Sequence, residues 1–352
     1  MKCPTNGVRS ASVHEAMRDP PKDSGRDYTG LTFSMAYPQA INLVAMRTVA
    51  QSLHDITMCD LHSGDLSLAH QDLLALVGMA HLHAESWTIV DQMIRSVMAG
   101  LAVDAVWMAL RAPGWTDGQL AELQDKLASL SFFKEMEQAI RAERAVGLDW
   151  YCALKTNRNA TAFGILNRGH SMADLPEKAL GWLWETLWAD GDLWFYCQYQ
   201  QRFIDLTHEL AVSNSYRQIA ADFDEFQTDI ERAFSGVRRY KYLWSAMHYP
   251  NMRRVLETLA KNETSRQLAI AAIAIERCKV RHGKLPSELK ELQPEFVSVL
   301  PVDLYVGRPL LYRPKVDGEF TLYSVGVNFR DDGGGTNDVV WPKPIWPANS
   351  TK

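Results

Sequence analysis

Charged side chains between residues 141 and 170 are of the types that acid–base chemistry uses. The cluster has six members: Arg141, Glu143, Arg144, Asp149, Arg168 and His170. A carboxylate and an imidazole that the fold brings together can pass a proton to and from a bound molecule. Opposite charges this close in the chain more often form surface salt bridges, which is the alternative interpretation.

No complete catalytic or metal motif is present in the sequence. His208 and Glu209 begin the pattern of a zinc protease, but the second histidine belongs at position 212, which is Val212. His81 and Glu85 are four residues apart and supply two metal ligands without a third. The three glycines at 333–335 precede no expected helix, so they do not form a phosphate-binding loop. We therefore assign no catalytic residue.

Aromatic residues crowd the segment 182–203, where Trp184 and Trp188, like Tyr196 and Tyr199, are neighbours on a helix face. A groove for a glycan or peptide is one interpretation, and rings that fill the seam between long helices are the other. The candidate ligand-binding residues are Trp184, Trp188, Tyr196, Tyr199, Arg141 and Glu143. The Asp190-Gly191-Asp192 sequence predicts a turn that divides the aromatic residues between two helices.

The composition is that of an ordinary globular protein. Of 352 residues, 47% are hydrophobic and 22% are charged, which is enough apolar material for a sizeable core. The formal net charge of -5 provides no general basic field for a phosphate backbone, so we expect no nucleic-acid partner. The five cysteines include no Cys-x-x-Cys pair, which argues against a disulfide scaffold or a thiolate metal site.

Apolar residues follow helical spacing from about residue 37, as in the stripe over residues 46–56. Gly64-Asp65 predicts a helix end and a new N-cap, and Ser86 predicts another cap. Thr116 and Gln119 have the spacing of a capping box. Since short connections make successive helices pack antiparallel, we predict a predominantly α protein built as an antiparallel helical-hairpin array.

This helical body is expected over residues 36–264, with turns that resemble those of tetratricopeptide-type repeats. The periodicity lapses near 155–175, which predicts a subdomain boundary or a functional loop. Residues 1–35, rich in Pro, Gly, Asp, Arg and Ser, predict a disordered or loosely packed leader.

A small α+β module is expected over residues 265–352. An apolar helix from Ser265 ends at Gly283, and Pro286 suits the first position of a short second helix. The hydrophobic period then changes to two. Residues 310–312 and 320–324 predict a β-hairpin whose turn contains Asp317 and Gly318.

This order of elements, followed by a Gly- and Asp-rich loop that ends in a tryptophan, resembles the soluble domain of type II secretion major pseudopilins. The residues that carry the resemblance are Gly283, Leu285, Pro286, Leu300, Pro301, Asp303, Gly307, Pro309, Tyr312, Tyr323, Ser324, Gly326, Asp332, Gly333, Gly334, Asp338 and Trp341. The sequence departs from the family in two places. Asn328 stands where the family has an aspartate, and Asp303-Leu304-Tyr305 stands where it has Asp-Pro-Trp.

In that family the loop after the Tyr-Ser strand binds calcium. The resemblance implies that Ser324, Asn328, Asp332, Asn337 and Asp338 supply hard oxygen ligands, of which calcium takes roughly six to eight. The alternative interpretation is an Asp/Gly turn that caps itself. We expect no other cofactor.

In layout the whole chain looks similar to a group of uncharacterised bacterial envelope proteins. No apolar stretch is long enough to span a membrane, although in such proteins a membrane segment often precedes the helical body, and a longer parent gene would supply one. The resemblance favours an extracytoplasmic location, whereas a chain complete as written would be cytoplasmic.

Two functions are consistent with these patterns. We predict a non-enzymatic interaction or scaffold protein with a protein or peptide partner. The alternative is a ligand-binding protein or enzyme that uses a pocket between residues 182–203 and 141–170.

Overall fold

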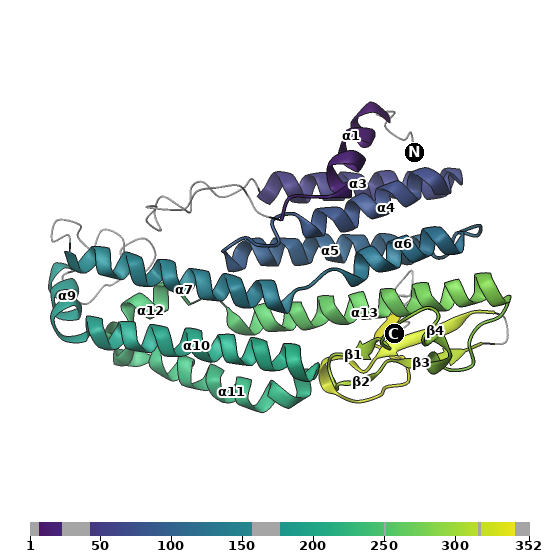
Figure 1. The fold of residues 1–352 in the computed structure, drawn as a ribbon. Coiled ribbons are helices and arrows are strands. Elements are labelled where there is room, and N and C mark those ends of the chain that lie inside the picture. Colours follow the sequence, from purple (N-terminus) through teal and green to yellow (C-terminus); the bar gives the residue numbers. More distant parts are fainter. Residues whose placement is uncertain (1–6, 23–42, 157–176, 250, 316–317, 342–352) are drawn as a thin grey trace, which may run out of the picture.

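The computed structural model describes residues 7–22, 43–156, 177–249, 251–315 and 318–341. It is predominantly helical, with a small antiparallel sheet near the C-terminus, as predicted (Figure 1). The α-helices are α1 (Gly7–Arg18), α3 (Leu43–Ser63), α4 (Leu66–His81), α5 (Ile89–Ala109), α6 (Asp117–Ala128), α7 (Phe133–Thr156), α9 (Glu177–Leu183), α10 (Ala189–Ser213), α11 (Tyr216–Ala233), α12 (Leu243–Met247) and α13 (Met252–His282).

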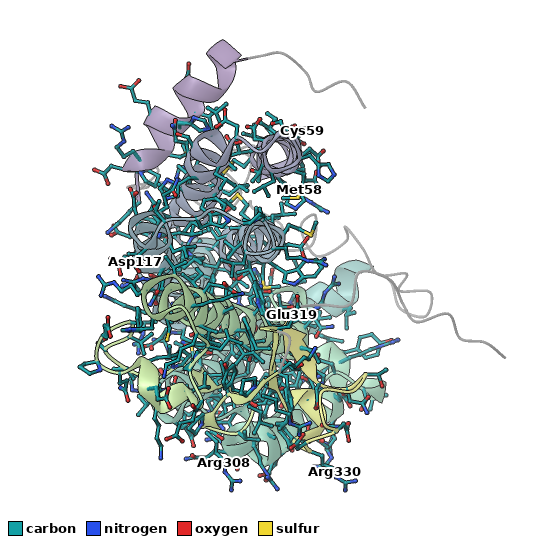
Figure 2. All side chains as sticks on the ribbon, turned by 90° about the vertical axis from the view of Figure 1, so that its right-hand side faces the viewer. Met58, Cys59, Asp117, Arg308, Glu319 and Arg330 are labelled. Atoms are coloured by element: carbon teal, nitrogen blue, oxygen red, sulfur yellow. The ribbon has the colours of Figure 1, made fainter. Side chains whose placement is uncertain are left out.

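The helices lie in layers that run in similar directions (Figure 1). Seen from the end of the molecule, Cys59 of α3 lies near one extreme of the stack and Arg308 of the C-terminal strands near the other (Figure 2). The buried apolar residues form one cluster that runs from Ala50 in α3 to Trp341 in the sheet. The helical body and the C-terminal module therefore share a core.

Local capping signals fix the junctions between α3 and α6. Gly64 adopts φ of +79°, and the Asp65 carboxylate accepts a hydrogen bond from the Leu68 N–H at 3.0 Å, so the predicted helix end and N-cap are confirmed. The capping box of Thr116 and Gln119 is also confirmed.

The start of α5 differs from the prediction. Thr88 caps the helix by accepting the Asp91 N–H at 3.0 Å, whereas the hydroxyl of the predicted cap, Ser86, donates to the Asp91 carboxylate. The prediction was wrong because Ser86 and Thr88 are equally good caps by residue type. Tertiary packing determines which of them has the capping position.

The aromatic segment contains a helix break, but not at residues 190–192. Asp190 and Asp192 lie in the first turn of α10. The break is the π-helical turn η2 (Trp184–Trp188), where the Ala189 N–H bonds the Trp184 carbonyl five residues back. The aromatic residues are thus shared among α9, η2 and α10, and the predicted turn was misplaced.

Helix α13 is the longest helix among the described residues, with 31 residues. The predicted boundary between residues 264 and 265 falls inside it, so the expected apolar helix from Ser265 begins earlier, at Met252. Gly283 ends it with φ of +71°, as predicted. The expected short helix at Pro286 is instead a 3-10 turn, η4 (Leu289–Leu292).

The described part of the C-terminal module contains five short strands and the 3-10 turn η5 (Gly326–Asn328). The strands are β1 (Val302–Asp303), β2 (Arg308–Pro309), β3 (Leu311–Pro314), β4 (Phe320–Ser324) and β5 (Val339–Trp341). Strands β3 and β4 form the predicted hairpin with Leu311 opposite Tyr323, and β5 adds to the other edge of β4 with Trp341 opposite Leu322.

The module also contacts α11 through backbone hydrogen bonds. The Leu304 and Tyr305 carbonyls accept the first free N–H groups of that helix, from Tyr216 at 2.8 Å and Arg217 at 3.0 Å. Helix N-termini leave such donors without partners inside the helix. The connection between β1 and β2 therefore supplies the cap for α11, in addition to the core that the module shares with α13.

An N-terminal helix docks on α4 where the composition predicts a loosely packed leader. Helix α1 lies so close that a Cβ atom at Gly78 would meet the Met17 carbonyl oxygen at 2.3 Å. Lys126 donates to the Met17 and Arg18 carbonyls, at 3.2 and 2.7 Å, and so satisfies the C-terminal end of α1. Residues 1–6 and 23–35 of the predicted leader lie outside the described residues.

A buried acid lies under α1. His14 of α1 hydrogen-bonds to Asp72 of α4, whose carboxyl group is buried. Burial first, and then the neighbouring Asp60 carboxyl group, raise the pKa of Asp72 to about 8. Burial lowers the pKa of His14. The pair is therefore held without net charge at neutral pH.

We predict that Asp72→Asn removes part of the pH dependence of stability. The unfolded carboxyl ionises near 3.8, so between pH 3.8 and about 8 the folded state binds the additional proton. The free energy of unfolding consequently falls as the pH rises through this window. The variant should therefore gain stability relative to the parent between about pH 5 and about pH 8, measured by urea unfolding. A difference in the free energy of unfolding between variant and parent that is the same at pH 5 and at pH 8 would contradict the assignment.

Candidate functional site

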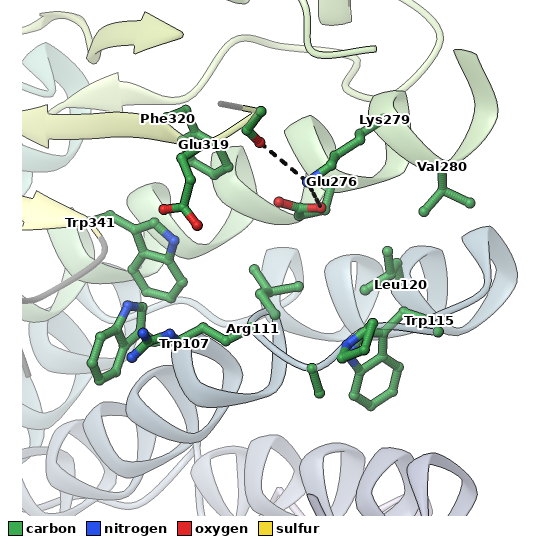
Figure 3. A pocket seen from close by; sticks show the side chains of 15 residues that line it. Trp107, Arg111, Trp115, Leu120, Glu276, Lys279, Val280, Glu319, Phe320 and Trp341 are labelled. Carbon is green, nitrogen blue, oxygen red and sulfur yellow. Dashed lines mark hydrogen bonds and ion pairs between the residues drawn. The ribbon is translucent and has the colours of Figure 1, made fainter. Parts of the chain in front are cut away.

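A cleft of about 540 Å³ opens where the helical body meets the C-terminal module. Its walls are the end of α5 with the connection to α6, the last turns of α13, and the edges of β4 and β5 (Figure 3). This volume lies within the range of roughly 300 to 1,000 Å³ that ligand sites occupy. The cleft is the candidate functional site of the described residues.

The connection between α5 and α6 is rigid. The Trp115 indole N–H donates to the Ala109 carbonyl at 2.7 Å, and Gly114 adopts φ of +104°, which disfavours other residues. Thr116 then starts α6 with its capping box. These local interactions hold the wall of the cleft in place without support from a ligand.

Charged groups face one another across the cleft. The Arg111 guanidinium lies over the Trp107 ring, 5.5 Å from its centroid, on the wall opposite Glu276 and Glu319 (Figure 3). Lys279 donates to the Gly318 carbonyl at 3.3 Å and lies 3.8 Å from the Glu276 carboxylate. Burial raises the pKa of Glu276, and Glu319 acts in the same direction while Lys279 opposes it. Two cations and two acids thus balance in formal charge.

Trp107 adds an unused hydrogen-bond donor. Its side chain is 7% exposed, and its indole N–H has no acceptor among the residues that the structure describes. A buried donor without a partner costs about 1–3 kcal/mol. No Ser, Thr, Cys or His is among the described residues that line the cleft. Its titratable side chains are those of Arg111, Glu276, Lys279 and Glu319.

The predicted aromatic site residues lie mainly in the core. Trp184, Tyr196 and Tyr199 are buried, and Trp188 is half-buried. The Tyr196 hydroxyl donates to the Glu143 carbonyl at 3.1 Å, and it fits there because Gly147 has no Cβ, which would lie 2.4 Å from it. Tyr196 lies in the seam between α7 and α10, whereas the Tyr199 hydroxyl donates to the His248 carbonyl beyond α12 at 3.2 Å. Rings that fill seams between helices are the second of the two interpretations of the segment.

A buried carboxylate organises this aromatic cluster. Asp192 accepts hydrogen bonds from the Trp184 indole at 2.8 Å, from the backbone N–H groups of Trp244 and Ser245 at 2.7 and 3.0 Å, and from the Ser245 hydroxyl at 2.5 Å. Burial raises its pKa, while the hydrogen bonds from Ser245 and Trp184 oppose that shift. Asp192 therefore caps the first turn of α12 from α10.

The two charged candidates point to different neighbours. Arg141 pairs with Glu137, one turn away on α7, at 2.6 Å. The Glu143 carboxylate accepts the Ile89 N–H at the start of α5 at 2.7 Å. Burial raises the pKa of Glu143 to about 7, against that hydrogen bond, and nearby Asp91 adds to the rise. Arg168 and His170 lie outside the described residues, as does most of the 155–175 segment.

The C-terminal loop satisfies its own carboxylates. Asp338 accepts backbone N–H groups from Gly334 at 2.7 Å and Gly335 at 3.2 Å. Asp332 accepts the side-chain amides of Asn328 at 2.8 Å and Asn337 at 2.9 Å. The predicted calcium ligands Asn328, Asp332 and Asn337 are thus close together in the loop and hydrogen-bond to one another.

Ser324 bonds to a carboxylate outside that loop. Its hydroxyl donates to buried Asp303 at 2.7 Å, and Asp303 also accepts the backbone N–H groups of Val325 and Tyr305. In the described part of the chain, no three His, Cys, Asp or Glu side chains gather as metal ligands do. Asp303 thus joins β1 to the end of β4.

None of the helices in the described ranges is long and apolar enough to cross a bilayer. No family model, no curated protein and no solved structure matches this chain.

Sequence reasoning missed the cleft because its walls come from three distant segments. Trp107, Trp115 and Trp341 are spread over the chain and share no local pattern. The Pro113-Gly114 pair, which marks a helix end, was the available local signal. Only the packing of α13 between body and module brings these residues together.

We predict that Asp192→Ala lowers the free energy of unfolding by about 3 kcal/mol or more, because it leaves buried donors of Trp184, Trp244 and Ser245 without an acceptor. Asp205→Ala, on the same helix, is the matched control. Its exposed hydrogen bond from the Gln201 side chain contributes about 1 kcal/mol or less. Urea unfolding of both variants measures the difference, and equal losses would contradict the central role of Asp192.

Proposed function

We propose that this protein is a non-enzymatic interaction protein whose cleft receives a polypeptide segment of a partner. The mixed charge of a cleft that three tryptophan rings line carries the proposal. A peptide offers charged side chains for both signs of wall and apolar groups for the rings.

The cell-envelope location belongs to the same proposal and depends on the pseudopilin-like resemblance. The order of elements supports that resemblance: a long apolar helix, a short helical turn, a β-hairpin, and an Asp/Gly loop that leads to Trp341. The alternative, a ligand pocket at the aromatic segment, has less support, because Trp184, Tyr196 and Tyr199 are packed inside the helices.

Selection from a random-peptide display library tests the cleft. Ala112 is on its lining, so Ala112→Trp should fill the space and weaken selected peptides by about tenfold or more. Val299→Trp adds the same ring at a site that is exposed and does not line the cleft, and it should leave the affinity unchanged. Peptides that bind both variants equally would show that the cleft is not the binding site.

Calcium binding by the C-terminal loop stays a prediction of the resemblance. If the site forms, millimolar calcium raises Tm, since the ion binds the folded state, and Asp332→Ala together with Asp338→Ala abolishes the rise. Magnesium, which requires a tighter octahedral shell, is the control ion. A parent protein whose Tm is unchanged by calcium would refute the prediction.

A further inference from the structure

Helix α9 lies at one end of the molecule (Figure 1), and large apolar side chains of α9 and the elements beside it are exposed. Trp182, Leu187 and Trp194 are 64%, 63% and 66% exposed. They come from α9, η2 and the start of α10, and they are close in sequence to Trp184, which is buried. Tryptophan is among the more buried residue types on average, so two solvent-exposed indole rings within one bend are unusual.

A second segment adds to the same end. The 3-10 turn η3 (Gly236–Lys241) contacts η2, α10 and α12. Its Val237 is 83% exposed, and Met247 at the end of α12 is also exposed. The five exposed residues, which we call the bend patch, are Trp182, Leu187, Trp194, Val237 and Met247. A cluster of this kind marks an interaction surface, whereas single exposed apolar residues do not.

Basic side chains accompany the bend patch. Arg238, Arg239 and Lys241 follow Val237 directly and are exposed. The acids of the η2 bend are Glu185, which is exposed, and Asp190, which pairs with Lys155 at 2.8 Å. Asp229 and Glu231 at the end of α11 are further exposed acids near η3, and Asp229 pairs with Arg232 at 3.2 Å. The basic charge beside the apolar residues is therefore local to η3, in a chain with a formal net charge of -5.

We propose that the bend patch binds the surface of an anionic lipid bilayer. Indole rings combine an apolar body with a polar N–H and so suit the headgroup level, while leucine, valine and methionine enter the acyl boundary. Arginine and lysine attract anionic headgroups, each contributing to affinity near the surface. The patch has basic and apolar side chains together, which match the anionic headgroups and the apolar acyl chains of such a bilayer. A partner that is only acidic or only apolar would match one of the two.

The position of the bend patch gives the contact an orientation. Helix α10 starts at the patch and has 25 residues, so it extends roughly 37 Å at 1.5 Å per residue. The C-terminal module lies at the opposite end of the molecule (Figure 1). A bilayer bound at the patch would therefore leave the module and its cleft accessible to a partner.

Co-sedimentation with vesicles tests the proposal. We expect the protein to sediment with vesicles of phosphatidylglycerol and phosphatidylcholine in equal parts, and to do so less as sodium chloride is raised to molar concentration. Trp182→Ala with Trp194→Ala should weaken this binding by about tenfold or more, because each ring loses its burial in the bilayer. Arg238→Glu with Lys241→Glu should remove the preference for phosphatidylglycerol over pure phosphatidylcholine.

Exposed valines of the C-terminal region provide the matched controls. Val299→Ala and Val327→Ala remove apolar surface away from the patch and should leave vesicle binding unchanged. Thermal unfolding checks that all variants fold. No sedimentation with phosphatidylglycerol vesicles, or a tryptophan variant that binds like the parent, would overturn the proposal. A dimer that dissociates in the tryptophan variant, without vesicle binding, would also overturn it and assign the patch to a second copy of the chain.

Discussion

The burial of α13 on two sides is the constraint on which the structure depends. Its apolar residues pack against α5 and α6 of the helical body and against the strands of the C-terminal module. Each fully buried Leu or Ile side chain contributes about 1.5–3 kcal/mol to stability. The helical body and the C-terminal module together therefore stabilise α13 more than either layer alone. The cleft exists because the two layers meet over α13 and separate again near Glu276 and Lys279.

Buried carboxylates in this protein mainly complete the architecture. Asp192 caps α12 across 52 residues of sequence, Asp303 joins β1 to the end of β4, and Asp338 holds the glycine loop. In each case backbone N–H groups that would otherwise lack partners are satisfied by a charged acceptor. Residue types that suggest chemistry in the sequence therefore serve to connect elements in the fold.

What the sequence predicted correctly was local. The period of the apolar residues and caps such as Asp65 and Gly283 depend on neighbours within one or two turns, so they are visible without a fold. The predicted boundary at residue 264 falls inside α13, where contacts with distant segments support the helix. Glu263 and Arg266 pair at 2.6 Å there, and Arg266 also donates to the Leu127 carbonyl at the end of α6. Docking of α1 and the cleft likewise depend on contacts between distant segments, which no local pattern encodes.

The unbroken helix α13 restricts how this chain can change in length. A residue inserted or deleted within an α-helix rotates everything beyond it by about 100°. In α13 that rotation would turn the face bound by the strands away from them while the face bound by α5 and α6 stayed in place. Variation in length is therefore confined to the connections, and the phase of this helix fixes the orientation of the module relative to the body.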